Sequence, residues 1–168
     1  KNVPKPIKPD NLNDKSVEGF YANIGFLHAG MQYLFMTADG SPLRESNVKG
    51  RDAVSKLEEQ YKSQGMPDKS WWGDVKIKVF LDTPQPDING DTYTWKGKTV
   101  TELGEFSVSN GEVQDIPEDK RHYEGATILT GIYKDGTWEI ETKEDNSASP
   151  SASGGASTGS GSGGGFGF

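Results

Sequence analysis

The chain lacks cysteine and long apolar runs. Among its 168 residues there is no cysteine, so disulfides, thiolate zinc sites and cysteine nucleophiles are excluded. No apolar run reaches the ~20 residues that a membrane-spanning helix needs, because the most apolar stretch is interrupted by Glu18, Asn23, His28 and Gln32. Neither GxxxxGK[ST] nor GxGxxG follows a predicted strand, so no phosphate-binding loop is indicated. We expect no cofactor.

Positive charge is also scarce. The chain carries 18 basic and 25 acidic side chains, for a formal net charge of −7. Nucleic acids and anionic lipid surfaces both attract proteins through a basic face. We therefore expect no nucleic-acid partner. Acidic balance also keeps a protein soluble, and that simpler explanation is sufficient here.

The two ends of the chain differ in composition from its middle. Residues 1–11, KNVPKPIKPDN, contain three prolines and three lysines and predict a semi-extended tether. Residues 146–168 are rich in Gly and Ser and carry no charge, which predicts a flexible tail. One domain is expected between them, over residues 12–145. The chain begins with Lys1 and not with Met, so we expect that a secretory signal was removed upstream.

Residues 16–38 have the periodicity of a long helix. Asn13, Asp14 or Ser16 can cap its start. One arc of the helix carries a sheet-facing stripe: Val17, Phe20, Tyr21, Ile24, Leu27, His28, Met31, Leu34, Phe35 and Ala38. A second apolar stripe lies opposite: Ala22, Phe26, Ala29, Tyr33 and Met36. Glycines 19, 25 and 30 would let neighbouring elements approach closely, so the helix is expected to be central and packed on both sides.

The remainder predicts one more helix followed by an antiparallel meander. Asp39-Gly40 and Pro42 end the first helix, and residues 50–65 predict a second one. From Trp71 onward the period is two, and residues 75–81 alternate four aliphatic side chains with Lys76, Lys78 and Phe80. Four dipeptides predict tight hairpins: Asn89-Gly90, Lys96-Gly97, Asn110-Gly111 and Asp135-Gly136. Short strands of undetermined order are expected over residues 91–124. Helices first and strands afterwards indicate an α+β fold.

That order resembles the nuclear-transport-factor-2-like (cystatin-like) cone, in which N-terminal helices pack on a curved antiparallel sheet. The chain more narrowly resembles an uncharacterised family of actinobacterial secreted lipoproteins, domain of unknown function 6318. The matching motifs are VPKPIKPDN, SVEGFYANIGFLHAGMQYLFMTADGSPLRE, WWGDVKI and YKDGTWEI, within residues 4–143. The family pattern also has a pair of cysteines near ESNVKGRD, and this chain has none there.

The resemblance implies a location but no activity. It implies export and a lipid anchor on a cysteine upstream of Lys1, so that the domain lies outside the cytoplasmic membrane and contacts the membrane only through the anchor. We expect an extracytoplasmic binding module for a small apolar ligand or an envelope protein, and a homodimer is left open.

His28 is the one ionisable group in the sheet-facing stripe. It can be a core histidine that makes a single hydrogen bond, or the polar group of a pocket between helix and sheet. The candidate pocket residues are Tyr21, His28, Phe35, Trp72 and Trp138. A small cone-fold isomerase or hydrolase that uses His28 is the alternative, and it would require a carboxylate opposite the histidine. We expect no catalytic residue.

Two further patterns have simpler explanations. Asp82, Asp87, Asn89 and Asp91 are spaced like calcium ligands, but Thr92 and Lys98 stand where an EF-hand needs Gly and Glu. A hairpin turn at Asn89-Gly90 accounts for the segment, and no metal site is expected. Trp71, Trp72, Tyr93 and Trp95 could form a sugar-stacking surface if they were exposed, and core packing is the competing explanation.

Overall fold

The computed structural model describes residues 3–63, 71–109 and 111–145. The predicted tail over residues 146–168 lies outside the described residues, and the domain boundaries at residues 11 and 145 stay predictions. Within the described part, helices come first and antiparallel strands follow, which confirms the α+β class. None of the described helices is long and apolar enough to cross a membrane.

Helix α1 (Val17–Thr37) is the long helix that the periodicity predicts. The Oγ of Ser16 accepts a hydrogen bond from the backbone N–H of Gly19 at 2.9 Å, which caps the free N–H groups of the first turn. At the other end Ala38 is left-handed, with φ of 63°, and its N–H donates to the carbonyl of Leu34. The cap at Ala38 ends α1 before Asp39-Gly40 is reached.

A short helix that the sequence did not predict follows directly. Helix α2 (Ser41–Glu45) holds Pro42 in its first turn, where the missing N–H of proline has no partner to lose. Gly30 lets α2 approach α1, because a Cβ there would lie 3.1 Å from the backbone nitrogen of Leu43. Helix α3 (Asp52–Ser63) is the predicted surface helix, and its Val54 is fully buried.

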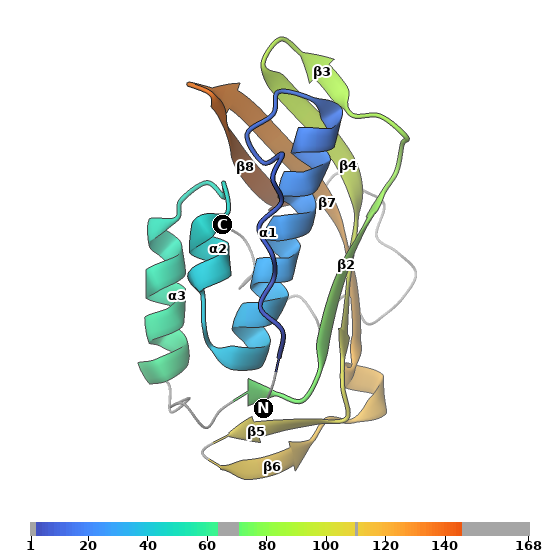
Figure 1. Cartoon of the computed structure of the whole chain (residues 1–168). Coiled ribbons are helices and arrows are strands. Elements are labelled where there is room, and N and C mark those ends of the chain that lie inside the picture. Colours follow the sequence, from blue (N-terminus) through green and yellow to red (C-terminus); the bar gives the residue numbers. More distant parts are fainter. Residues whose placement is uncertain (1–2, 64–70, 110, 146–168) are drawn as a thin grey trace.

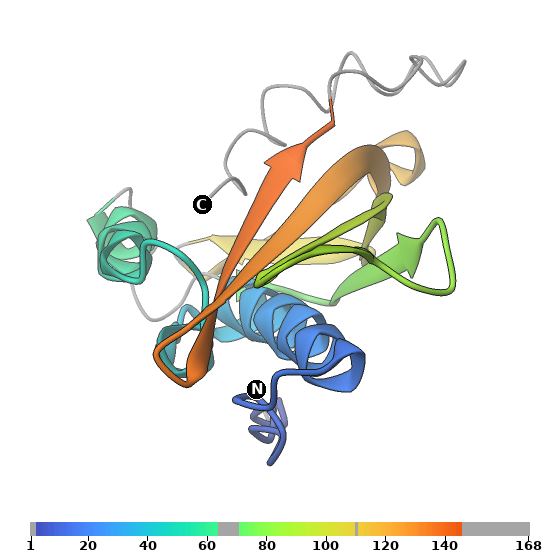
Figure 2. The ribbon, with the colours of Figure 1, turned by 90° about the horizontal axis from the view of Figure 1, so that it is seen from above.

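The main sheet is antiparallel and has five strands. Its members are β2 (Val75–Leu81), β3 (Asp87–Asn89), β4 (Thr92–Leu103), β7 (His122–Lys134) and β8 (Thr137–Glu144). The spatial order is β2-β4-β7-β8, with β3 also paired to β4. Helix α1 runs along one face of this sheet (Figure 1), and a view turned by 90° shows the strands curving over the helix (Figure 2).

A smaller sheet closes one end of the molecule. Its strands are β1 (Trp71–Trp72), β5 (Phe106–Ser109) and β6 (Glu112–Asp115), in the order β1-β5-β6. A 3₁₀ turn, Glu118–Lys120, leads from it into β7. The small sheet lies near the C-terminal end of α1 (Figure 1).

Two predicted turns are hairpin turns in the structure and one is not. Gly90 joins β3 to β4 with φ of 62°, and Asp135 and Gly136 join β7 to β8 with φ of 54° and 79°. The predicted hairpin at Lys96-Gly97 is wrong, because both residues lie inside the twelve-residue β4. Gly97 is required there by a close approach, since a Cβ would overlap the carbonyl oxygen of Phe80 on β2. Asn110 lies outside the described residues.

The core forms where aromatic rings from α1 and the sheet meet. The Phe20 ring stacks on Trp138 and Trp95 at centroid distances of 5.4 and 6.0 Å. Tyr93 packs edge-on against Phe20 and Trp138. These side chains are all buried, and Gly131 provides the space beneath Phe20 and Trp138.

The N-terminal segment joins α1 to the final hairpin. Leu12 is buried, and its carbonyl accepts a hydrogen bond from Nδ2 of Asn23 at 2.8 Å. Trp138 Nε1 donates to the carbonyl of Asp14, and the Tyr133 hydroxyl donates to the carbonyl of Asn13, both at 2.7 Å. Residues before this point run along the outside of α1 (Figure 1).

Candidate functional site

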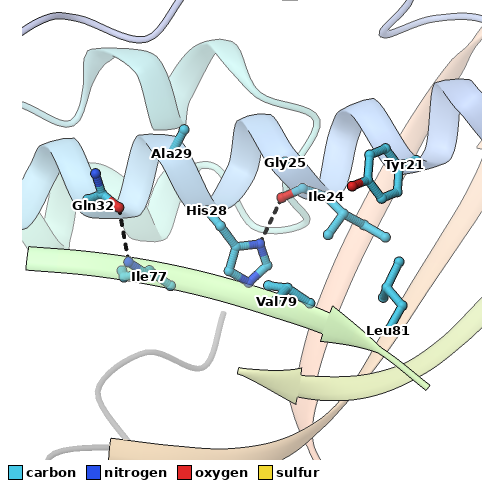
Figure 3. A pocket seen from close by; sticks show the side chains of 9 residues that line it. All are labelled: Tyr21, Ile24, Gly25, His28, Ala29, Gln32, Ile77, Val79 and Leu81. Atoms are coloured by element: carbon cyan, nitrogen blue, oxygen red, sulfur yellow. Dashed lines mark hydrogen bonds between the residues drawn. The ribbon is translucent and has the colours of Figure 1, made fainter. Parts of the chain in front are cut away.

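A groove lies between α1 and the edge strand β2. Its volume is about 220 Å³. Figure 3 shows the lining side chains, which come from these two elements alone: Tyr21, Ile24, Gly25, His28, Ala29, Gln32, Ile77, Val79 and Leu81. Gly25 and Ala29 are small and leave space on the helix side of the groove. The aliphatic side chains of β2 form the opposite wall. The groove is therefore a largely apolar space.

His28 is the buried polar group of this groove. Its side chain is only 5% exposed, and Nδ1 lies 2.7 Å from the carbonyl oxygen of Ile24. A carbonyl can only accept, so Nδ1 carries the proton and Nε2 is left as an acceptor. Nε2 has no hydrogen-bond partner among the described residues. Every fully buried side-chain nitrogen or oxygen among these residues does have a partner, so Nε2 itself is not fully buried. Nε2 therefore has access to the groove.

Burial determines the charge of His28. Desolvation lowers the pKa of His28 below its ordinary value, and the hydrogen bond to Ile24 opposes this shift only in part. The imidazole is therefore neutral near pH 7, which suits an acceptor and not a cation. Both alternatives left open by the sequence hold in part: His28 is packed and singly hydrogen-bonded, and it also lines a groove.

Gln32 occupies the next position along the groove. Its Oε1 accepts a hydrogen bond from the backbone N–H of Ile77 at 3.0 Å (Figure 3). Because β2 is an edge strand, this N–H has no neighbouring strand to pair with. The side-chain amide of Gln32 takes the place of a strand at this one position.

The pairing register shows which backbone groups of β2 face outward. Asp82 N–H donates to the carbonyl of Lys96, and Gly104 N–H donates to the carbonyl of Asp74. Hydrogen-bonded pairs alternate along an antiparallel ladder, so the even-numbered residues of β2 bond to β4. The backbone groups of Val79 and Leu81 consequently point to the open edge.

A second groove adjoins the first on the other side of α1. Its volume is about 370 Å³, and it lies between α1 and the N-terminal segment. The residues lining it are Pro6, Ile7, Pro9, Tyr21, Ala22, Gly25, Phe26 and Ala29. The two grooves share Tyr21, Gly25 and Ala29, so they form neighbouring parts of one apolar surface. Ile7 is 90% and Tyr21 is 59% exposed, which leaves large apolar groups facing solvent here.

The second apolar stripe of α1 is covered differently from the prediction. We expected the next helix or a partner to cover it. Phe26 is only 3% exposed and lies in the groove beneath the N-terminal segment. The residues predicted to be a tether thus supply part of the cover, and α2 supplies another part at Gly30.

The structure brings together two of the five candidate pocket residues. Tyr21 and His28 line the first groove. Phe35 and Trp138 are buried in the core, and Trp72 is half-buried against it. Gly25, Ala29 and Gln32 also line this groove and were not among the predicted pocket residues. Their spacing from Tyr21, at four, eight and eleven residues, places them on one face of a helix, and that signal could have identified them.

Among the described residues, the calcium pattern supplies an ion pair, and two of the four aromatic side chains of the sugar-stacking pattern are buried. The Asp91 carboxylate accepts from Lys15 Nζ at 2.5 Å, and no cluster of His, Asp and Glu suited to a metal is found among the described residues. Tyr93 and Trp95 are buried, which removes them from any surface for sugars. The side chain of Trp71 lies outside the described residues.

The geometry defines an α+β domain whose long helix lies on a curved antiparallel sheet, with an apolar groove along the edge strand. The chain belongs to the family of unknown function DUF6318, whose model matches residues 1–144. This confirms the predicted membership of domain of unknown function 6318, whereas secretion and a lipid anchor stay predictions. No curated protein matches the chain.

Three solved structures show similarity at low sequence identity. TsrD from Streptomyces laurentii is 13% identical, with 74% of this chain and 89% of that chain covered and a TM-score of 0.36. AclR from Streptomyces galilaeus is 12% identical, with 77% of each chain covered and a TM-score of 0.39. An NTF2-like protein with a cystatin-like fold from Novosphingobium aromaticivorans is 18% identical, with 86% and 97% covered and a TM-score of 0.36.

Proposed function

We propose that this domain is a binding module that takes one small apolar group into the groove between α1 and β2. The proposal rests on Nε2 of His28, which has no hydrogen-bond partner among the described residues. The His28 side chain is only 5% exposed and lines a largely apolar groove. A donor on a ligand in the groove would therefore gain a hydrogen bond to Nε2 that no described residue of the protein supplies.

The groove limits the size of the group. An engineered apolar cavity of about 150 Å³ binds benzene, and this groove has about 220 Å³. A single ring or a branched alkyl group matches that space. A hydroxyl or N–H on the group would donate to Nε2 of His28, since Nδ1 is already engaged.

The enzyme alternative gains no support from the groove. Acid–base catalysis by His28 would require a second titratable group opposite it. The groove-lining residues within the described part of the chain include no carboxylate.

The proposed location follows the family resemblance. The domain would act outside the cytoplasmic membrane, held by a lipid on a cysteine that precedes Lys1, and would meet small ligands or envelope proteins there. Growth of the source cells with a radiolabelled fatty acid, followed by immunoprecipitation of the full gene product, is expected to give a labelled protein. An unlabelled protein in the cytosolic fraction would overturn this location.

Binding can be tested with two probes of equal shape. Toluene and p-cresol are titrated against ¹⁵N-labelled protein, with amide shifts of α1 and β2 as the readout. Both are expected to shift residues of the groove, and p-cresol is expected to bind about tenfold more tightly because its hydroxyl can donate to His28. His28→Phe is expected to abolish that preference.

Gly25→Phe supplies the blocking variant. A Cβ at Gly25 meets no atom within 4 Å, so the ring can enter the groove without disturbing α1. We expect it to abolish the shifts from both probes. Ala53→Phe, at an exposed position on α3, is the matched control and is expected to leave binding unchanged. Wild-type protein that shows no shift at saturating probe would refute the proposal.

A further inference from the structure

We infer that the apolar group entering the groove belongs to an extended acidic peptide that pairs as an added strand with the open edge of β2. This inference rests on the proposed function of the groove. It assigns the edge of β2 as an interaction surface and an acidic–apolar alternating segment of another protein as the partner.

The first support is the contrast between the two edges of the main sheet. At β8 the edge is occupied at Ile140, whose N–H donates to Asn47 and whose carbonyl accepts from Lys49, at 2.8 and 2.7 Å. At β2 the Gln32 amide occupies only the N–H of Ile77. No hydrogen bond links the outward backbone groups of Val79 and Leu81 to any described residue. They form a template for a further strand.

The second support is the alternation of side chains along β2. Ile77, Val79 and Leu81 face the groove, whereas Lys76, Lys78 and Phe80 face away from it. Residues directly opposite in paired antiparallel strands have Cβ atoms about 5 Å apart. One set of side chains on an added strand would therefore enter the groove, and the alternate set would lie beside the lysines.

The third support is charge. Lys15, Lys49, Lys98 and Lys143 form ion pairs with Asp91, Glu141 and Glu124, whereas several other exposed lysines, Lys134 among them, have none within the described residues. Lys76 and Lys78 are exposed and have no ion pair within the described residues. In a chain with a net charge of −7, both cations precede the open stretch of the described edge, residues 79–81, and Asp82 follows it. Glutamate or aspartate on the outer face of the added strand would complement the two lysines.

A second copy of this chain complements these lysines less well. Antiparallel pairing of two β2 strands through Val79 and Leu81 would place Phe80 or Asp82 opposite Lys78, whereas the peptide would place a carboxylate at each outward position. The hydrogen bond from Ile77 to Gln32 also sets a limit to the pairing, because only Val79 to Leu81 remain open. The expected motif is therefore short, with one ring or branched side chain for the groove and acidic residues on either side of it.

The test uses a fluorescein-labelled peptide, Glu-Val-Glu-Phe-Glu-Val-Glu, and a Lys-Val-Lys-Phe-Lys-Val-Lys control. Anisotropy is expected to show binding of the acidic peptide only. Hydrogen exchange at the amides of Val79 and Leu81 is expected to slow in the complex. Val79→Pro removes an outward N–H without removing a bond to β4, and should weaken binding about tenfold.

Charge reversal provides a variant that keeps the edge strand intact. Lys78→Glu is expected to weaken binding of the acidic peptide about tenfold and to permit binding of the lysine peptide. Lys134→Glu, at an exposed lysine at the far end of β7, is the matched control and is expected to change neither. Binding of the lysine peptide to the Lys78→Glu variant could not result from a loss of folding.

The outcomes separate this inference from the proposed function. If p-cresol binds and Gly25→Phe abolishes it, but no acidic peptide binds, the edge pairing is overturned and the groove function stands. If neither probe binds, both are overturned. If Val79 and Leu81 become protected only as protein concentration rises, with dimers in analytical ultracentrifugation, the partner is a second copy and the peptide assignment is wrong.

Discussion

His28 combines a structural and a chemical role through its two ring nitrogens. The periodicity of α1 correctly predicted that His28 lies on the sheet-facing side. Its tautomer and the access of Nε2 to a groove could not be predicted from sequence, because they depend on how far β2 stands from α1. That distance is set by side chains of both elements, and Gln32, which joins them at Ile77, was not selected by the sequence pattern.

A pH prediction follows from the burial of His28. Burial lowers the pKa in the folded state, whereas the unfolded chain keeps an ordinary value near 6.5. The unfolded state therefore binds the proton first as pH falls, and stability is lost below about pH 6.5. The loss is about 1.4 kcal/mol per pH unit until the folded pKa is reached. Urea unfolding at pH 7.5, 6 and 5 measures it.

The variant His28→Gln should lose this component of the pH dependence. His122→Gln, at an exposed histidine on β7, is the control and should retain it. Parallel pH profiles for wild type and His28→Gln would show that protonation of His28 is not coupled to folding.

At the scale of elements, sustained periodicity was sufficient to place helices and strands, whereas a single glycine could be misleading. The bounds of α1 and β2 follow from repeats of 3.6 and 2 sustained over many residues. Pro42 was expected to bar continuation of the first helix, which does end before it, but Pro42 also lies in the unpredicted α2. Gly97 was predicted to form a hairpin turn, yet it lies within β4. Its close approach to Phe80 on β2 is a contact between elements, and a local pattern does not contain that information.

Two glycines of α1 should respond oppositely to the same change. A Cβ at Gly19 would overlap the carbonyl oxygen of Asp14, which also accepts from Trp138. Gly19→Ala should therefore cost about 1–3 kcal/mol. At Gly25 a Cβ meets nothing within 4 Å, so Gly25→Ala should stabilise by about 0.5–1 kcal/mol through helix propensity.

Thermal unfolding followed by circular dichroism gives both values in one buffer. The two variants serve as controls for each other, because they differ only in position along the same helix. Equal effects of the two changes would mean that the segment before α1 does not dock against Gly19 in solution.

At the scale of the whole molecule, one buried asparagine joins three distant parts of the chain. Asn47 lies in the segment between α2 and α3. Its Nδ2 donates to Oδ1 of Asn23 on α1 at 2.9 Å, and its Oδ1 accepts from Thr137 on β8 at 3.3 Å. Its backbone carbonyl accepts from Ile140. This polar cluster holds the segment against the sheet without a covalent link.

Asn47→Ala should destabilise the protein by about 1–3 kcal/mol, because it leaves the buried Oδ1 of Asn23 without this donor. Ser55→Ala, at an exposed site on α3, should change stability by less than about 0.5 kcal/mol. Equilibrium urea unfolding with both variants measures the difference. A cost for Asn47→Ala no larger than that of Ser55→Ala would contradict the role assigned to the cluster.

The docking of the N-terminal segment onto the last hairpin has a kinetic consequence. The hydrogen bonds of Asn13 and Asp14 to Tyr133 and Trp138 span 120 and 124 residues. Contacts of such high sequence separation form slowly, because a large loop must close first. These contacts of the core can therefore form only after the final hairpin has been synthesised. Such late closure suits the proposed export, since an unfolded chain can pass through a narrow channel before its first and last segments meet.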